Sequence, residues 1–230
     1  MKIIICTIKS WNINEALKLK EKYKDYCTIK VISKKEDLNY EDIQHFNPDY
    51  IFFPHWSYLI PESIFTDFEC VVFHMTDLPF GRGGSPLQNL ISRGIKETKI
   101  SSLSVQKELD AGPIYLKENL NLCGTAEEIF IRASKIIFNK MITYIIENKP
   151  IPQEQQGEVV EFKRRRPEDG KLLPTMSLEE MYDYIRMLDG EGYPPAFMKF
   201  GNYKLNFSRA SLKNGKIVAD VEITEEDEHE

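Results

Sequence analysis

The chain of 230 residues has few of the features that mark secreted, metal-binding or membrane proteins. Its four cysteines lie far apart without a C-x-x-C pair, so we expect buried free thiols and no metal site. It has no run of eighteen apolar residues and does not open with a charged segment followed by an apolar one. We therefore expect a cytoplasmic protein without membrane contact.

Basic charge is also scarce. The formal net charge is -6, and much of the excess acid lies in the last six residues. Lys163–Arg166 is the one dense basic cluster, and a solvated charge run is a better expectation for it than a diphosphate contact. Because a protein that grips nucleic acid needs a basic face, this balance disfavours a nucleic-acid partner.

Short apolar segments alternate with helical patterns in the first half of the chain. The segments expected as strands are Met1–Ile8, Cys27–Ile32, Asp49–Phe53 and Cys70–His74. Helical periodicity follows the first of them from Ile13 and recurs over residues 37–46. This alternation predicts an α/β fold with a doubly wound, mostly parallel sheet, whose ligands bind at the carboxyl ends of the strands.

The second half predicts a strand over residues 100–105 and a long helix over residues 125–148, with a capping box of Thr125 and Glu128. Beyond it we expect a helix near residues 178–188 and two strands around a Gly201-Asn202 turn. The predicted divisions are a catalytic domain, a linker, a small β-containing lobe and an acidic tail, over residues 1–149, 150–161, 162–224 and 225–230. The linker assignment rests on two prolines and three glutamines in residues 150–157.

The segment most suggestive of chemistry begins at His74, which ends an apolar strand. A loop with three glycines follows over residues 75–86 (MTDLPFGRGGSP), and such loops let backbone amides approach a ligand closely. On these residues alone, a tight crossover with an incidental histidine is an equal alternative. Asp110 comes 36 residues later, in a second loop over residues 108–113 (ELDAGP) that follows the strand at 100–105. This second element favours a functional site.

Together these loops resemble the signature of the 10-formyltetrahydrofolate-dependent formyltransferases. The resemblance covers residues 49–144 and continues weakly through residues 166–170, 184–188 and 193–197. It implies a Rossmann-like variant fold, 10-formyltetrahydrofolate as the formyl donor, no metal, and an amine as the formyl acceptor.

The family's catalytic histidine and aspartate map onto His74 and Asp110. The resemblance implies that His74 donates a hydrogen bond to the formyl oxygen as charge develops there, while Asp110 orients the imidazole and receives the amine proton. The family's asparagine two residues before the histidine is Val72 here, which has no donor.

The candidate replacements for that donor are His55, Trp56, Ser57, Thr76 or a backbone N–H of the loop. We prefer His55, because it leaves a neighbouring strand at the same rim. A histidine packed under a loop has equal weight.

The resemblance also implies contacts to the pterin ring. They come from Leu78, Pro79, Leu109 and Asp110, with Gly81, Arg82 and Gly83 at the opening where folate and acceptor meet. Arg82 is either a contact to an acceptor phosphate or a solvent-facing loop residue.

The short second lobe resembles the nucleotide-sugar branch of the family, and the loop wording is similar to enzymes of pseudaminic-acid-type pathways. The implied acceptor is a nucleotide-linked 4-amino-4,6-dideoxy sugar, with a homodimer as one compatible assembly. The residues expected to contact this acceptor are Lys9, Trp11, Asn12, Trp56 and Tyr193. The alternatives are a methionyl-tRNA formyltransferase, a formyltetrahydrofolate hydrolase, and a ligand-binding module whose catalysis was lost with the asparagine.

Overall fold

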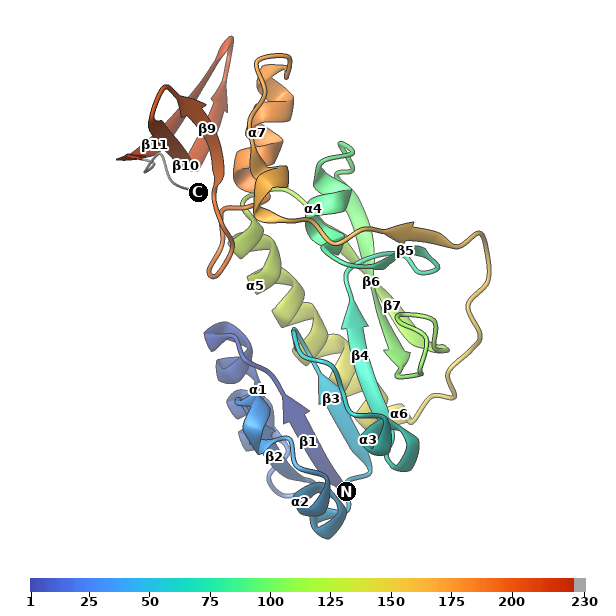
Figure 1. Cartoon of the computed structure of the whole chain (residues 1–230). Helices are drawn as coiled ribbons and strands as arrows, with labels where there is room; N and C mark the ends of the chain where they lie inside the picture. The colour runs from blue at the N-terminus through green and yellow to red at the C-terminus, as the bar shows by residue number, and fades with distance from the viewer. Residues whose placement is uncertain (226–230) are drawn as a thin grey trace. The chain divides into compact units, whose positions relative to one another are not determined.

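The computed structural model describes residues 1–225, which pack as two compact units (Figure 1). Unit 1 contains residues 1–83, 99–120 and 131–161. Unit 2 contains residues 84–98 and 121–130 and the chain from Phe162 onward. The predicted domain limits at residues 149 and 161 stay a prediction, and most of the expected acidic tail lies outside the described residues.

The core of unit 1 is a sheet with the strand order β2-β1-β3-β4-β6-β7. Its strands are β1 (Lys2–Cys6), β2 (Thr28–Ile32), β3 (Tyr50–Phe53), β4 (Cys70–His74), β6 (Glu97–Ser104) and β7 (Ile114–Asn121). The first four are parallel, and β6 runs antiparallel to β4. Figure 1 shows β1, β3 and β4 side by side. The predicted α/β class and mostly parallel sheet are confirmed. The sequence did not indicate β7.

Helices cover both faces of this sheet because successive strand residues point to opposite sides. On one face, residues such as Ile4 and Phe53 pack with Ile43 and Ile64 from two helices, α2 (Tyr40–Phe46) and α3 (Glu62–Asp67). The other helices of the unit are α1 (Ser10–Lys22), the later part of α5 (Ala126–Ile136), the π-helical η2 (Ile137–Ile142) and α6 (Thr143–Asn148). The doubly wound arrangement follows from these two covered faces.

Helix boundaries differ in places from the expectation. The helix predicted over residues 37–46 is shorter, because a 3₁₀ turn, η1 (Lys35–Asp37), precedes it and Asn39 caps α2 by accepting a hydrogen bond from the Asp42 N–H at 3.2 Å. The capping box of the long helix is confirmed. The Thr125 N–H donates to Glu128 at 2.8 Å, and the Glu128 N–H donates to the Thr125 hydroxyl at 3.3 Å.

Unit 2 is built on an antiparallel sheet with the strand order β11-β10-β9. Its strands are β9 (Ala196–Phe200), β10 (Tyr203–Lys213) and β11 (Lys216–Glu225), and its helices are α4 (Pro86–Ile91), η3 (Pro167–Gly170) and α7 (Leu178–Arg186). The predicted small β-containing lobe is confirmed, although β10 extends beyond the expected residue 208 and β11 was not anticipated. A short ladder pairs β5 (Phe80–Gly83) with β8 (Val160–Phe162).

Two expectations from composition concern the burial of the cysteines and the absence of membrane-spanning helices. None of the four cysteines, all of which lie within residues 1–225, forms a disulfide, but Cys123 is exposed, so the expectation that every thiol is buried was wrong at that position. It follows β7 at a turn, outside the apolar core. No helix within residues 1–225 is long and apolar enough to cross a membrane.

Arg186 anchors the polar interior of unit 2. Its side chain is 3% exposed, and its Nε donates to Asp183 at 2.6 Å. Its Nη1 donates to the carbonyls of Leu122 at 2.6 Å and Gly124 at 2.9 Å. Since a buried charge must be paired and hydrogen-bonded, this one side chain joins α7 to the segment that leads into α5.

We predict that Arg186→Ala lowers the free energy of unfolding by about 3 to 5 kcal/mol, because it leaves the Asp183 carboxylate and two carbonyls without their partner. Urea denaturation measures the loss. Lys18→Ala is the control, because Lys18 pairs with Glu15 on the surface and its removal should cost less than about 1 kcal/mol. Equal losses in the two variants would contradict this account.

Candidate functional site

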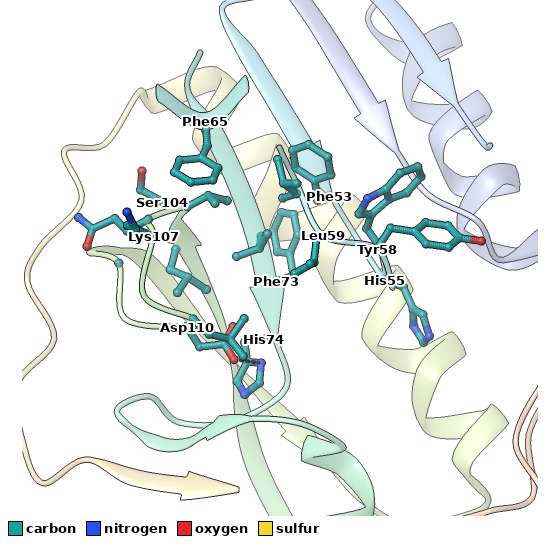
Figure 2. Close-up of a pocket in the computed structure, with 18 residues that line it drawn as sticks. Phe53, His55, Tyr58, Leu59, Phe65, Phe73, His74, Ser104, Lys107 and Asp110 are labelled. Carbon is teal, nitrogen blue, oxygen red and sulfur yellow. Dashed lines mark ion pairs between the residues drawn. The ribbon is translucent and has the colours of Figure 1, made fainter. Parts of the chain in front are cut away.

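A cavity of about 390 Å³ lies in unit 1, beside the ends of β3 and β4 (Figure 2). Apolar side chains form most of its wall: Phe53, Trp56, Leu59, Ile60, Phe65, Val72, Phe73, Leu103, Val105 and Leu109. His74 and Asp110 provide the acid–base groups, and Figure 2 shows them directed toward one another. The segment after β6 runs back along β4, since Val105 bonds to Cys70 at the start of that strand while Asp110 meets His74 at its end.

Both ring nitrogens of His74 face oxygen atoms. Nε2 donates to the Gly81 carbonyl at 2.7 Å, and because a carbonyl can only accept, the proton of a neutral ring lies on Nε2. Nδ1 lies 3.5 Å from Asp110 Oδ2, at the outer limit of a hydrogen bond. Gly81 is not part of the cavity wall, so the Nδ1 edge of the ring is the one beside the cavity.

Asp110 is held in an unusual backbone conformation. Its φ of 54° lies in the left-handed region, which is unfavourable for a residue with a side chain. The carboxylate accepts a hydrogen bond from the Gly83 N–H at 2.9 Å. The loop also packs closely against β6, because a Cβ at Gly112 would lie 1.9 Å from the Ser104 carbonyl oxygen. Only glycine fits there.

Gln155 joins the two loops of the site. Its Oε1 accepts hydrogen bonds from Arg82 Nε at 3.1 Å and Nη2 at 2.9 Å. Its Nε2 donates to the carbonyls of Asp110 at 2.8 Å and Gly112 at 2.9 Å. Arg82, expected to be either a phosphate contact or a solvent-facing residue, instead has most of its donors bound within unit 1.

The turn after His74 is fixed by a lysine from β7. Lys117 donates to the Asp77 carboxylate and to the Leu78 carbonyl, each at 2.5 Å, and Lys99 pairs with Asp77 at 2.9 Å. Burial acts to raise the pKa of Asp77, but the hydrogen bonds and charges of the two lysines bring its pKa below the usual value. The predicted pterin contacts of this turn therefore belong to a rigid segment. Leu78 is buried, whereas Leu109 is 65% exposed at the cavity rim.

His55 lines the same cavity but turns away from His74 and Asp110. Its ring meets the Trp11 ring edge-on, with centroids 6.1 Å apart, and Figure 2 shows it directed away from His74 and Asp110. Burial, assisted by the nearby Lys9 ammonium, lowers the pKa of His55 to about 4. His55 is therefore neutral near pH 7.

The other candidate donors, Thr76, Ser57 and Trp56, differ in their exposure and in their hydrogen bonds. The Thr76 hydroxyl donates to the Gly81 carbonyl at 3.3 Å, and Ser57 is exposed. Trp56 lines the cavity, and its indole N–H is buried without a hydrogen-bond partner. A buried donor of this kind is unusual in a native protein and points to a group supplied from outside the chain.

The residues expected to contact the acceptor do not all belong to one unit. In unit 1, the Lys9 ammonium lies 5.7 Å from the centre of the Trp11 ring, and Asn12 donates to the Pro54 carbonyl at 3.3 Å. The indole nitrogen of Trp11 and the amide oxygen of Asn12 are buried without partners. Tyr193 belongs to unit 2, where it stacks on Phe130.

Sequence reasoning missed Gln155 and Lys117. Nothing in a glutamine-rich linker or a charged edge segment marks these side chains, because their partners lie about 40 or more positions away in the chain. Among residues 1–225, no group of three or more His, Cys, Asp or Glu side chains could hold a metal ion.

Comparison with known proteins identifies both parts of the chain. Residues 10–132 match the model of the formyl transferase family, and residues 167–224 match the model of the methionyl-tRNA formyltransferase C-terminal domain. A structure titled methionyl-tRNA formyltransferase from Clostridium thermocellum is 60% identical, with a TM-score of 0.96, and the match covers 98% of this chain and 99% of that one.

More distant relatives agree with the fold. The methionyl-tRNA formyltransferase of a Wolbachia strain is 26% identical over 85% of this chain and 67% of its own length. The chain spans about two thirds of that relative's length and 52% of the length of a methionyl-tRNA formyltransferase from Bacillus thuringiensis. A sugar N-formyltransferase from a Shewanella species has a TM-score of 0.69 at 13% identity, covers 96% of each chain, and shows the fold alone.

These relatives overturn the expected acceptor. A nucleotide-linked amino sugar was the wrong expectation, and so was the expectation that the charge balance disfavours a nucleic-acid partner, because the relatives that are 26% and 60% identical are named for methionyl-tRNA. The physical reason is that a net charge averaged over the chain does not exclude a locally basic surface. Matches in both halves of the sequence confirm the resemblance of the two loops at His74 and Asp110 to this family. This chain belongs to the formyl transferase family.

Proposed function

We propose that the chain transfers the formyl group of 10-formyltetrahydrofolate to the amino group of methionyl-tRNA. The observation that carries this proposal is the His74–Asp110 pair at the wall of an apolar cavity. The names of the relatives support the choice of acceptor.

The cavity suits a flat heteroaromatic ring. Its walls are mostly apolar, and the segment around Leu109 supplies backbone groups at the rim. The buried Trp56 N–H offers a hydrogen bond that no residue of the described chain accepts. Leu78, Pro79, Leu109 and Asp110 remain the predicted pterin contacts. When bound, 10-formyltetrahydrofolate supplies an activated formyl carbon.

The chain's own residues supply the proton chemistry. The Gly81 carbonyl fixes the Nε2–H tautomer of His74, and a second proton on Nδ1 would lie between the ring and the Asp110 carboxylate. From that position Nδ1–H can be shared with an oxygen that gains negative charge in the cavity. Asp110 orients the ring and can receive a proton from the attacking amine, directly or through water.

Val72 leaves open which group assists His74. His55 remains the predicted residue, as a neutral imidazole with one N–H to donate, and would have to turn from Trp11 to do so. Trp56 lines the cavity, and its buried indole N–H has no hydrogen-bond partner within residues 1–225 to give up. Substitution of each residue in turn, with kcat measured at saturating donor, separates the two roles.

We predict that the purified chain formylates methionyl-tRNA and that His74→Ala lowers kcat by about 10²- to 10³-fold, the usual loss when an oxyanion donor is removed. Asp110→Asn should lower kcat to a similar extent, because an amide can still accept from Gly83 but cannot take up a proton. The assay follows labelled formyl groups into acid-precipitable tRNA.

Ser63→Ala is the control, since Ser63 is exposed on α3 and is not among the candidate donors. Full activity in His74→Ala would exclude the proposed chemistry. Release of tetrahydrofolate without any formylated tRNA would exclude the proposed acceptor and favour transfer to water.

A further prediction concerns pH. The pKa of His55 is about 4 in the folded chain and about 6.5 when unfolded, so only the unfolded state takes up this proton between those values. The resulting stability is present above pH 6.5 and is lost as the pH falls toward 4. Between pH 7 and pH 5 the wild type should lose at most about 2 kcal/mol more than His55→Asn.

Asparagine is chosen because it tolerates the left-handed backbone of His55, whose φ is 55°. Urea denaturation at several pH values measures the difference. Parallel pH curves for the two proteins would show that burial of His55 does not disfavour its charged form.

A further inference from the structure

A second cavity, of about 200 Å³, lies within unit 2 and shares no wall residue with the first. Its wall consists of Ser85, Gln88, Arg164, Arg165, Arg166, Pro167, Gly170, Leu188, Gly192, Tyr193 and Pro194. It therefore contains the only dense basic cluster of the sequence. We propose that this cavity binds a backbone phosphate of the nucleic-acid acceptor, an inference that rests on the proposed function.

The three arginines of this cavity, Arg164, Arg165 and Arg166, differ in their hydrogen bonds and ring contacts. Arg165 donates to the Asp169 carbonyl at 2.5 Å and lies over the Tyr184 ring, 5.1 Å from its centre. Arg164 and Arg166 form no ion pair with a carboxylate anywhere in residues 1–225. By contrast, the buried Arg186 is fully paired. Two unneutralised guanidinium groups at one cavity favour an anion, and the guanidinium fork matches phosphate geometry.

The neutral groups of the cavity are also donors. The Ser85 hydroxyl oxygen accepts a hydrogen bond from the Arg165 N–H at 3.0 Å, which leaves its own hydrogen to donate. Tyr193 stacks on Phe130 with ring centroids 5.5 Å apart, and burial raises the pKa of its phenol, which keeps its hydrogen. A phosphate diester has only acceptors, so donors on several sides complement it.

The arginine segment is anchored to unit 2, which argues against a freely solvated charge run. The Gly84 N–H donates to the Phe162 carbonyl at 3.1 Å, and Asn89 donates to the Lys163 carbonyl at 2.9 Å. A Cβ at Gly84 would lie 2.5 Å from the Arg164 Cβ, so the two backbones touch. The backbone that carries the three arginines is therefore held in place before any ligand binds.

The test compares the full chain with Arg164→Gln/Arg166→Gln, using methionyl-tRNA and the same tRNA without methionine. We expect the double variant to bind both RNAs at least about tenfold more weakly, with a slope of log affinity against log salt reduced by about 1 to 2. The kcat at saturating tRNA and the KM for 10-formyltetrahydrofolate should not change. Thermal melting verifies that the variant is folded.

Lys213→Gln/Lys216→Gln is the matched control, because it removes the same charge from exposed positions at the β10–β11 turn of the same unit. Equal affinities and salt slopes in the wild type and the arginine variant would overturn this inference, as would an equal loss in the lysine variant. Failure of the wild type to formylate methionyl-tRNA would instead overturn the proposed function.

The four hydrogen bonds of Gln155 carry a second inference independently. We infer that Gln155 is a positioning residue for Asp110, although it lies in the predicted linker. Its amide ties the Asp110 and Gly112 carbonyls to Arg82 on the loop after His74. Since the left-handed backbone of Asp110 is unfavourable by itself, loss of this clamp should let the carboxylate move from Nδ1 of His74.

Gln155→Ala should lower kcat about tenfold while the KM for methionyl-tRNA and the melting temperature stay near the wild-type values. Gln155→Glu should be similarly impaired, because a carboxylate cannot donate to the two carbonyls. Gln156→Ala is the control, since Gln156 is exposed beside it. A kcat for Gln155→Ala equal to that of Gln156→Ala would overturn the inference, as would a loss that follows melting temperature alone.

Discussion

The contact between the Asp110 carboxylate and the His74 ring is the constraint on which the geometry of the candidate site depends. The loop after β6 begins beside the start of β4 and must reach the end of that strand. It does so with Asp110 in a left-handed backbone conformation that costs about 1 to 2 kcal/mol. The Gly83 N–H and the Gln155 amide offset that cost from two other segments. The geometry of the His74–Asp110 pair therefore depends on three loops together.

The burial of each strand explains which parts of the fold can be predicted from sequence. Strands β1 to β4 have covered faces, so their apolar runs identify them with nearly correct limits. β7 is interrupted by Lys117 and Glu118, and β11 is mostly exposed, so its alternating apolar residues Ile217, Val221 and Ile223 were not recognised as a strand. Only pairing with a neighbouring strand defines them. α2 is shorter than predicted because the Asn39 side chain caps the helix at a later residue than the apolar periodicity indicated.

For the site, predictability depends on distance along the chain. His74 and Asp110 are found from sequence because the two loops beside them resemble the family's signature, whereas the glycines of the first loop alone left an incidental histidine as an equal alternative. Gln155 and Lys117 are not, because their roles exist only after distant segments meet. His55 occupies the expected rim, but its ring packs on Trp11, and such an orientation is set by tertiary contacts. Its identity as a donor stays a prediction.

The acceptor was the least predictable feature, and the reason is physical. The residues predicted to act on the formyl group lie at one cavity of unit 1, and groups that act on the reacting atoms carry no information about the body of the acceptor. Specificity for the acceptor must come from contacts elsewhere. The net charge of -6 is a sum over the whole chain. It counts distant acidic groups against Arg164 and Arg166, although none within residues 1–225 forms an ion pair with either arginine. Local pairing, which only the structure reveals, decides whether a cationic cluster is available to an anion.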